Sequence, residues 1–147
     1  MTKQDEELLL KDLSARIYYG VIVHVESHDG GVDHSFDNNL IGIQSKCAIV
    51  PRENGIITHF PISLGGSVKP YLRSMSSMTE KEIEIYHKKN QTDRLGGMGV
   101  PIRHHLYRTQ ECIDWLIKNH FDYRGLIGKR LAIKVTPDNN PYKRNRK

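Results

Sequence analysis

This sequence of 147 residues has little of what several protein classes require. It contains two cysteines, Cys47 and Cys112, too few for the disulfide frameworks that hold small secreted domains together. Its apolar runs, of which residues 17–23 are an example, are much shorter than the roughly 20 residues that span a bilayer. Hydrophobic residues make up 37% of the chain, which excludes a membrane protein but supports the modest core of one domain.

Signatures of common catalytic and cofactor sites are also missing. The chain has no Cys-x-x-Cys or His-Glu-x-x-His pattern, and Gly96–Gly99 follows no predicted strand, as a dinucleotide-binding turn would. Residues 125–130 contain Gly-x-x-Gly-Lys-Arg, which lacks the length and the Ser or Thr of a P-loop. The first residues are acidic and polar, unlike a secretory signal. We therefore expect a cytoplasmic protein with reduced thiols, no cofactor and no membrane contact.

Charge is the strongest compositional feature that is present. Residues 1–68 carry five basic and nine acidic side chains, a net of −4, whereas residues 69–147 carry seventeen basic and eight acidic, a net of +9. Such an asymmetry suggests a surface that faces a polyanion, with nucleic acid as the usual partner. The alternative is that the charge serves solubility alone.

Hydrophobic spacing and capping residues predict the secondary structure. Thr2 and Thr79 open capping boxes for helices over residues 3–16 and 79–90, and Thr109 caps a third helix that runs to Asn119. Residues 27–39 read as a polar loop. We expect an α+β fold, in which a small antiparallel sheet or partly closed barrel is packed by two or three helices. One domain covers residues 1–136, and residues 137–147 form a basic, disordered tail. Strands are expected at residues 21–26, 40–44, 47–50, 56–60, 68–72 and 131–135.

Two blocks of the sequence resemble a known group of proteins. The first is Lys-Pro-Tyr-Leu-Arg-Ser-Met-Ser-Ser-Met-Thr-Glu at residues 69–80. The second joins Ile-Asp-Trp-Leu at 113–116 to His-Phe-Asp-Tyr-Arg-Gly-Leu-Ile at 120–127. With these blocks the chain resembles a family of short uncharacterised proteins from gut bacteria and their phages and prophages. The resemblance implies a phage or mobile-element setting and no particular activity.

The segment from Lys69 to Thr79 is one candidate binding site. Two cations, Lys69 and Arg73, precede the hydroxyls of Ser76 and Ser77 at a predicted helix start, where backbone amides favour anions. A phosphate group would fit this set. The alternative is that the serines only shape the turn.

A second candidate is the repeated pairing of tyrosine with a basic neighbour. Aromatic rings stack on unpaired bases and basic groups hold phosphates in proteins that bind single-stranded nucleic acid. The alternative is a set of half-buried tyrosines with satisfied hydroxyls. Together with Lys129 and Arg130, the candidate residues are Tyr71, Arg73, Tyr107, Arg108, Tyr123 and Arg124.

Two sets of residue types point to chemistry. His24, His28, Asp29 and His34 are of the types that bind zinc or another divalent ion, although their spacing matches no zinc signature. Cys47 or Cys112, with His59 and Asp114, would supply a thiol nucleophile with its base.

We expect a non-enzymatic accessory protein, related to phages or mobile elements, that contacts nucleic acid through its basic C-terminal half. The first alternative is a protein-interaction module of the host-takeover or anti-defence type, which would bind a host or phage protein. Its surface would be an apolar patch around Trp115, Phe121 and Tyr123. The second alternative is a small hydrolase or metal-dependent enzyme.

Overall fold

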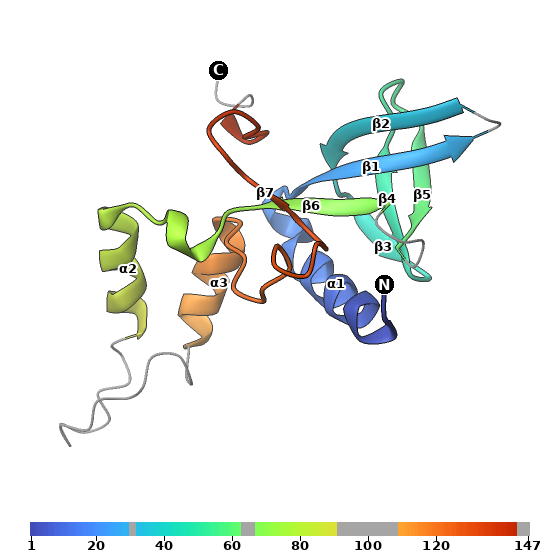
Figure 1. The fold of residues 1–147 in the computed structure, drawn as a ribbon. Coiled ribbons are helices and arrows are strands. Elements are labelled where there is room, and N and C mark those ends of the chain that lie inside the picture. Colours follow the sequence, from blue (N-terminus) through green and yellow to red (C-terminus); the bar gives the residue numbers. More distant parts are fainter. Residues whose placement is uncertain (30–31, 63–66, 91–108, 144–147) are drawn as a thin grey trace.

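The computed structural model describes residues 1–29, 32–62, 67–90 and 109–143, with the backbone alone at residues 28, 29, 32 and 34. These residues form three α-helices and seven strands, which confirms the predicted α+β class. The strands make two small sheets, and within the described residues these are not closed into a barrel. Helices α2 and α3 lie together at one end of the molecule and strands β2 to β5 at the other (Figure 1).

The order of elements follows the predicted one. Two short 3-10 helices, η1 (Ile17–Tyr19) and η2 (Met75–Ser77), precede β1 and α2. The helices and strands are α1 (Lys3–Arg16), β1 (Ile22–Asp29), β2 (Val32–Asn39), β3 (Gly42–Gln44), β4 (Cys47–Pro51), β5 (Ile57–Pro61), β6 (Val68–Leu72), α2 (Glu80–Asn90), α3 (Gln110–Lys118) and β7 (Ile133–Lys134).

Each helix begins at its predicted capping residue. The Thr2 hydroxyl accepts from the Asp5 amide at 3.0 Å, and the Asp5 carboxylate accepts from the Thr2 amide at 3.3 Å. The same reciprocal pair joins Thr79 and Glu82 ahead of α2. Thr109 accepts from the Cys112 amide at 3.0 Å ahead of α3. These side chains satisfy amides that have no partner within the helix, so they set where each helix starts.

The larger sheet has the strand order β2-β1-β6-β7. Strand β1 is antiparallel to β2 and β6, and β6 is parallel to β7. In this register His24 lies opposite Asp37 on one side and Lys69 on the other, so all three share one face of the sheet. The smaller sheet has the order β3-β4-β5 and is antiparallel, with Asn54 and Gly55 in the turn between β4 and β5.

The polar loop predicted over residues 27–39 is wrong. Strand β1 continues to Asp29, and β2 runs from Val32 to Asn39, with every residue of β2 opposite one of β1. Phe36 is buried, whereas Ser35 and Asp37 on either side of it are exposed. Strand β2 is largely polar because one of its faces meets water. It is a strand because it pairs with β1, although its sequence lacks the clear alternation of apolar and polar residues that usually predicts one.

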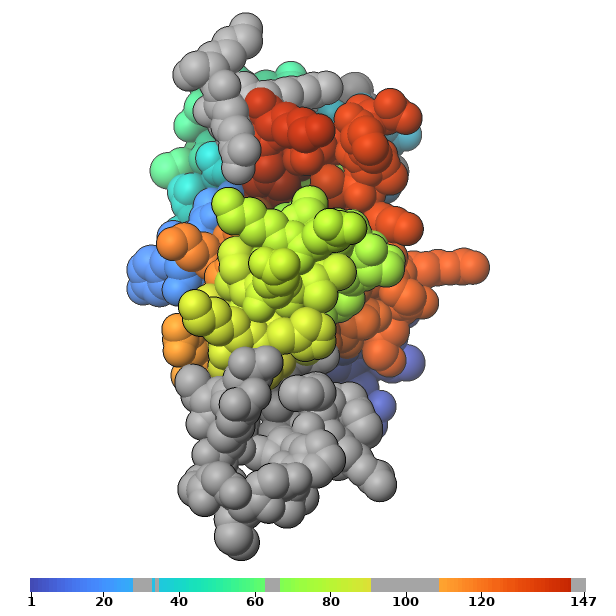
Figure 2. All heavy atoms as spheres, turned by 90° about the vertical axis from the view of Figure 1, so that its left-hand side faces the viewer, coloured from blue at the N-terminus to red at the C-terminus, as the bar shows by residue number. Residues whose placement is uncertain are grey.

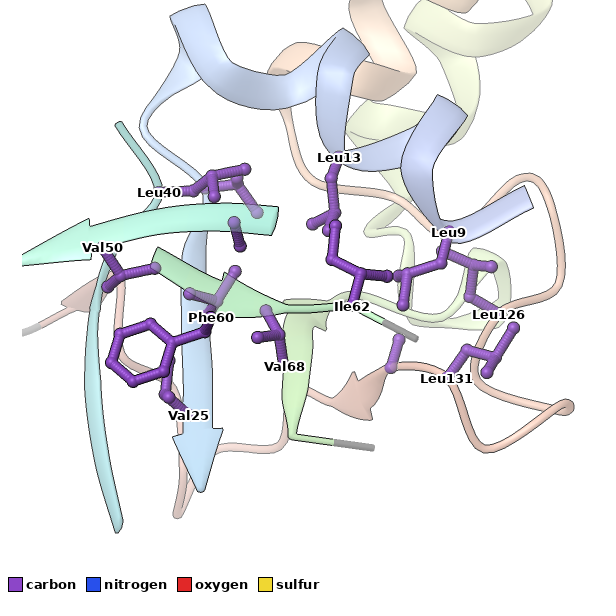
Figure 3. Close-up of a cluster of buried hydrophobic side chains, with 14 of the residues drawn as sticks. Leu9, Leu13, Val25, Leu40, Val50, Phe60, Ile62, Val68, Leu126 and Leu131 are labelled. Atoms are coloured by element: carbon purple, nitrogen blue, oxygen red, sulfur yellow. The ribbon is translucent and has the colours of Figure 1, made fainter. Parts of the chain in front are cut away.

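The main core lies between α1 and the sheets. Leu9 and Leu13 project from α1 towards Ile62, Leu126 and Leu131, all of which are almost completely buried (Figure 3). A smaller core is formed by Cys112 and Leu116 of α3 together with Phe121, with partly buried side chains packed around it. These side chains are Met75, Met78, Tyr86, Trp115 and Tyr123.

The C-terminal residues pack on the domain as far as they are described. The Tyr142 hydroxyl donates to the Tyr71 carbonyl at 2.7 Å and accepts from the Ile22 amide at 3.2 Å. Its ring stacks on that of His120, with centroids 4.1 Å apart and planes 7° from parallel. Burial raises the pKa of the Tyr142 hydroxyl. Residues 137–143 therefore differ from the predicted disordered tail, because one aromatic side chain anchors them; residues 144–147 lie outside the described part.

Candidate nucleic-acid interface

The basic charge of the chain is concentrated at its C-terminal end. Residues 123–147 contain eight basic residues and one acidic residue, Asp138, a net of +7 that exceeds the net charge of the whole chain. Figure 2 shows the last described residues, in red, at the surface above α2. The basic residues of this segment are Arg124, Lys129, Arg130, Lys134, Lys143, Arg144, Arg146 and Lys147, of which the last three lie outside the described residues.

A tight turn follows α3 and presents two of these cations. The Asp122 carboxylate accepts from the Leu126 amide at 2.8 Å and from the Ile127 amide at 2.9 Å. Further along, the Lys129 amide donates to the Leu126 carbonyl and the Arg130 amide to the Ile127 carbonyl. This network of local hydrogen bonds gives residues 122–130 a defined shape.

The two apolar residues inside the Gly-x-x-Gly pattern anchor this turn. Leu126 is fully buried in the main core, and Ile127 packs against it. Gly125, with a φ of +77°, and Gly128 are both exposed. The side chains of Leu126 and Ile127 therefore fix the turn on the core. The backbone at the two glycines carries no side chain and faces solvent.

Lys129 and Arg130 are both exposed at the end of this turn. The Lys129 side chain is 53% exposed, and its ammonium lies 3.8 Å from the Asp5 carboxylate on α1. An ion pair of that length at the surface contributes little, so a phosphate oxygen competes with it readily. The exposed glycines beside these cations leave room for a sugar–phosphate backbone to approach the turn.

Tyr123 and Arg124, two of the predicted contacts, are instead engaged inside the fold. The Arg124 Nε donates to the Tyr123 hydroxyl at 2.9 Å and lies 3.4 Å from the Asp12 carboxylate of α1. The guanidinium is 5.0 Å from the centre of the Tyr123 ring, and the Arg124 side chain is only 16% exposed. Both side chains help to hold residues 122–124 against α1.

Arg73 also has its charge satisfied within the protein. Its two terminal nitrogens each donate to one oxygen of Glu82 at 2.8 Å, and its guanidinium lies 4.2 Å from the centre of the Phe121 ring. The hydrogen bonds from Arg73 hold the pKa of Glu82 at about 2, below its ordinary value of 4.5. A phosphate group at Arg73 would have to displace this bidentate carboxylate.

Lys69 and Tyr71 both lie on the polar face of the larger sheet. Tyr71 is only 8% exposed, and its hydroxyl donates to Asp37 at 3.0 Å. Its ring is therefore packed in the fold, while Lys69 on the same strand is half-buried opposite His24.

The hydroxyls of Ser76 and Ser77 shape the turn ahead of α2. The Ser77 hydroxyl donates to the Ser74 carbonyl at 2.7 Å, and the Ser76 and Ser74 hydroxyls lie 3.0 Å apart. These contacts agree with the alternative stated for the segment from Lys69 to Thr79, in which the serines shape the turn. The remaining predicted pair, Tyr107 and Arg108, lies outside the described residues.

Of the possible metal ligands, only the side chain of His24 lies in the described part of the chain. Its Nδ1 is 2.7 Å from an Asp37 oxygen and its Nε2 is 3.0 Å from the Ser35 hydroxyl. The side chains of His28, Asp29 and His34 are outside the described part. Among the side chains that the structure places, none form a group of three or more suited to a metal ion.

The residues expected for a thiol nucleophile are divided between α3 and the smaller sheet, which lie at opposite ends of the molecule (Figure 1). Cys112 is fully buried on the inner side of α3, and Asp114 on the exposed side of that helix accepts from the Gln110 side chain at 2.8 Å. The half-buried Cys47 on β4 and the exposed His59 on β5 share one face of the smaller sheet, and Asp114 is far from both.

The rings expected to form an apolar docking patch pack inward. Phe121 is fully buried, the half-buried Trp115 stacks on it at 5.5 Å, and Tyr123 lies within 6.0 Å of the Arg16 guanidinium. Larger apolar exposures are found elsewhere, at Tyr18 and at Ile56.

Sequence reasoning missed the residue that shapes the basic turn. The Asp122 carboxylate accepts hydrogen bonds from the amides four and five residues further along the chain. An aspartate ahead of a glycine-containing stretch is a turn signal that could have been recognised.

Comparison of the chain with protein-family models, with curated proteins and with solved structures found no match. The resemblance to a phage-related family therefore stays a prediction. In the part of the chain that the structure describes, every helix is too short or too polar to cross a membrane.

Proposed function

We propose that this protein binds nucleic acid through the turn at residues 125–130 and the basic segment that follows it. The observation that carries the proposal is the pair of exposed cations, Lys129 and Arg130, on a turn fixed by Asp122 and Leu126. The family resemblance favours an accessory role in a phage or mobile element. Lys134 and Lys143, both exposed, extend the cationic surface along the chain.

The mode of binding follows from the contacts. Lysine and arginine side chains neutralise phosphates and release counterions, whereas sequence is read by groups that reach the bases. The tyrosines at residues 71 and 123 are committed to hydrogen bonds within the fold. We therefore expect binding to the phosphate backbone, with little preference for sequence and a strong dependence on salt.

Fluorescence anisotropy with labelled single-stranded and double-stranded DNA and RNA tests the proposal. We expect micromolar affinity at about 50 mM salt and a loss of about 10- to 100-fold at 200 mM, as two to four phosphate contacts would give. The double variant Lys129→Gln, Arg130→Gln should bind at least about 10-fold more weakly at 50 mM salt. The slope of its log affinity against log salt concentration should become shallower by the amount expected for about two phosphate contacts.

Two further chains separate the turn from other sources of charge. The variant Lys81→Gln, Lys88→Gln removes two exposed lysines from α2 and should bind like the wild type. A chain ending at Lys143 loses Arg144, Arg146 and Lys147 but keeps the Tyr142 anchor, and it should retain binding. No binding at low salt, or binding that disappears with residues 144–147 but survives the double variant, would overturn the proposal.

A further inference from the structure

The polar face of the larger sheet carries a chain of hydrogen bonds through three side chains. The Nδ1 of His24 on β1 lies 2.7 Å from the Oδ1 of Asp37 on β2. On the other side of the ring, the Nε2 lies 3.0 Å from the Oγ of Ser35, also on β2. Neither the proposed nucleic-acid interface nor the core uses this cluster.

The strand register brings these side chains together. His24 and Asp37 are directly opposite each other in the β1–β2 pair, and Ser35 lies two residues before Asp37 on the same face. The Tyr71 hydroxyl on β6 donates to the same Asp37 oxygen at 3.0 Å, and its ring meets the His24 ring edge-on at 6.5 Å. Asp37 on β2 is therefore held by side chains from β1 and from β6.

The hydrogen-bond roles follow from the chemistry of the groups. An ionised carboxylate only accepts, so the His24 Nδ1 donates its proton to Asp37. The Nε2 then has a lone pair, which accepts from the Ser35 hydroxyl. This is the order of nucleophile, base and orienting carboxylate that activates a serine. We propose that Ser35, His24 and Asp37 form a hydrolytic site for carboxylic esters.

In the first half of the reaction, the Ser35 Oγ attacks the ester carbonyl carbon while its proton moves to the His24 Nε2. The new bond between Oγ and carbon forms as the carbonyl π electrons move to the oxygen. This intermediate collapses by breaking the bond from carbon to the alcohol oxygen, and His24 protonates the departing alcohol. Asp37 holds the ring and stabilises the imidazolium that forms.

In the second half, water replaces the alcohol. His24 takes a proton from the water as its oxygen attacks the acyl carbon. The bond from carbon to the Ser35 oxygen then breaks, Ser35 regains its proton from His24, and the carboxylic acid leaves. One ester and one water are consumed, and one acid and one alcohol are released.

The surroundings of the cluster suit a small, accessible substrate. Ser35 is exposed, and the His24 side chain is 21% exposed. Lys69, the partner of His24 on β6, places a positive charge on the same face of the sheet. The Glu26 carboxylate lies 3.6 Å from the His24 Nε2 and competes with Ser35 for the protonated ring.

Hydrolysis of p-nitrophenyl acetate by the full chain is the first test. We expect Ser35→Ala, His24→Gln and Asp37→Asn each to lower the rate by about 100-fold or more, within the range of lost acid–base catalysis. Ser76→Ala removes another exposed serine and should leave the rate unchanged. Circular dichroism of each variant checks that the fold is intact. A Ser35→Ala rate equal to that of the wild type would overturn the proposal.

Labelling with a fluorophosphonate is the second test and does not depend on turnover. In this reaction the Ser35 oxygen displaces fluoride from phosphorus, which adds a fixed mass to the chain. We expect one adduct per chain, located at Ser35 by peptide mass spectrometry and absent from His24→Gln. No adduct, or an adduct at another serine, would count against the site. The variant Lys129→Gln, Arg130→Gln should label like the wild type, so the two proposals fail separately.

Discussion

Asp12 and Arg16 form an ion pair in which both side chains are completely buried, with the Arg16 Nε 2.8 Å from an Asp12 oxygen. The pair lies one turn apart on α1. A second Arg16 nitrogen reaches across to the Phe121 carbonyl at 2.7 Å, and the Arg124 Nε approaches Asp12 at 3.4 Å. This network joins the first helix to the segment after the last one, next to the turn that carries Lys129.

Removing one partner of this pair should be strongly destabilising. Asp12→Ala leaves the Arg16 charge buried without its carboxylate, and we expect a loss of about 3–5 kcal/mol in the free energy of unfolding. Urea denaturation at neutral pH measures it. Lys11→Ala, on the exposed side of the same helix, should change the stability by less than about 0.5 kcal/mol. A loss below about 1 kcal/mol in Asp12→Ala would contradict the assigned role.

The Arg73–Glu82 pair predicts how stability changes in acid. Because the pKa of Glu82 is about 2 in the fold and 4.5 ordinarily, its contribution is complete above about pH 4.5 and is lost as the pH falls through 2. Glu82→Gln should lower the stability at neutral pH by about 1–3 kcal/mol and flatten this acid dependence. Urea unfolding between pH 2 and 7 measures both effects. Glu84→Gln, exposed on the same helix, should behave like the wild type.

His120 predicts a second pH dependence, at higher pH. Burial, with the nearby Arg16 and Arg73, lowers the pKa of His120 to about 4 from 6.5, and among the described residues its Nδ1 has no hydrogen-bond partner. The unfolded chain therefore binds a proton first, so stability is lost as the pH falls from 6.5 towards 4.

His120→Asn tests this dependence with little backbone cost. His120 has a φ of +63°, a conformation that asparagine tolerates better than most residues. The variant should lose the part of the pH dependence between 6.5 and 4, even if removing the stack on Tyr142 lowers its overall stability. His87→Asn, at an exposed position on α2, is the control. An unchanged slope in His120→Asn would disprove the assignment.

The two glycines of the basic turn should respond differently to alanine. Gly125 has a φ of +77°, so Gly125→Ala should cost about 1–2 kcal/mol through its backbone conformation alone. At Gly128 an added Cβ would meet only the Gly125 carbonyl oxygen, at an ordinary 3.7 Å, so Gly128→Ala should leave the stability almost unchanged. Thermal unfolding of the two variants side by side measures the difference. Equal losses would show that the turn is held in some other way.

The local elements of this fold could be predicted from the sequence because local contacts create them. The capping hydroxyls of Thr2, Thr79 and Thr109 accept hydrogen bonds from amides three residues further along the chain. A few consecutive residues therefore determine where each helix starts. Most strands were predicted from the pattern of apolar residues within each strand. Strand β2 was missed because its signal is its pairing with β1, and it is polar apart from residues such as Phe36.

The candidate sites show the same difference between features that local sequence predicts and contacts that depend on the fold. Sequence alone determined that the basic charge gathers in the C-terminal half and that Lys129 and Arg130 directly follow a Gly-x-x-Gly pattern. Only the tertiary structure decided that Arg73 pairs with Glu82. It also decided that Tyr142 docks on His120, and that Ser35 and Asp37 meet His24. These contacts join residues that are 9 to 22 positions apart in the chain, and strand register and helix packing select them rather than any local preference of the backbone.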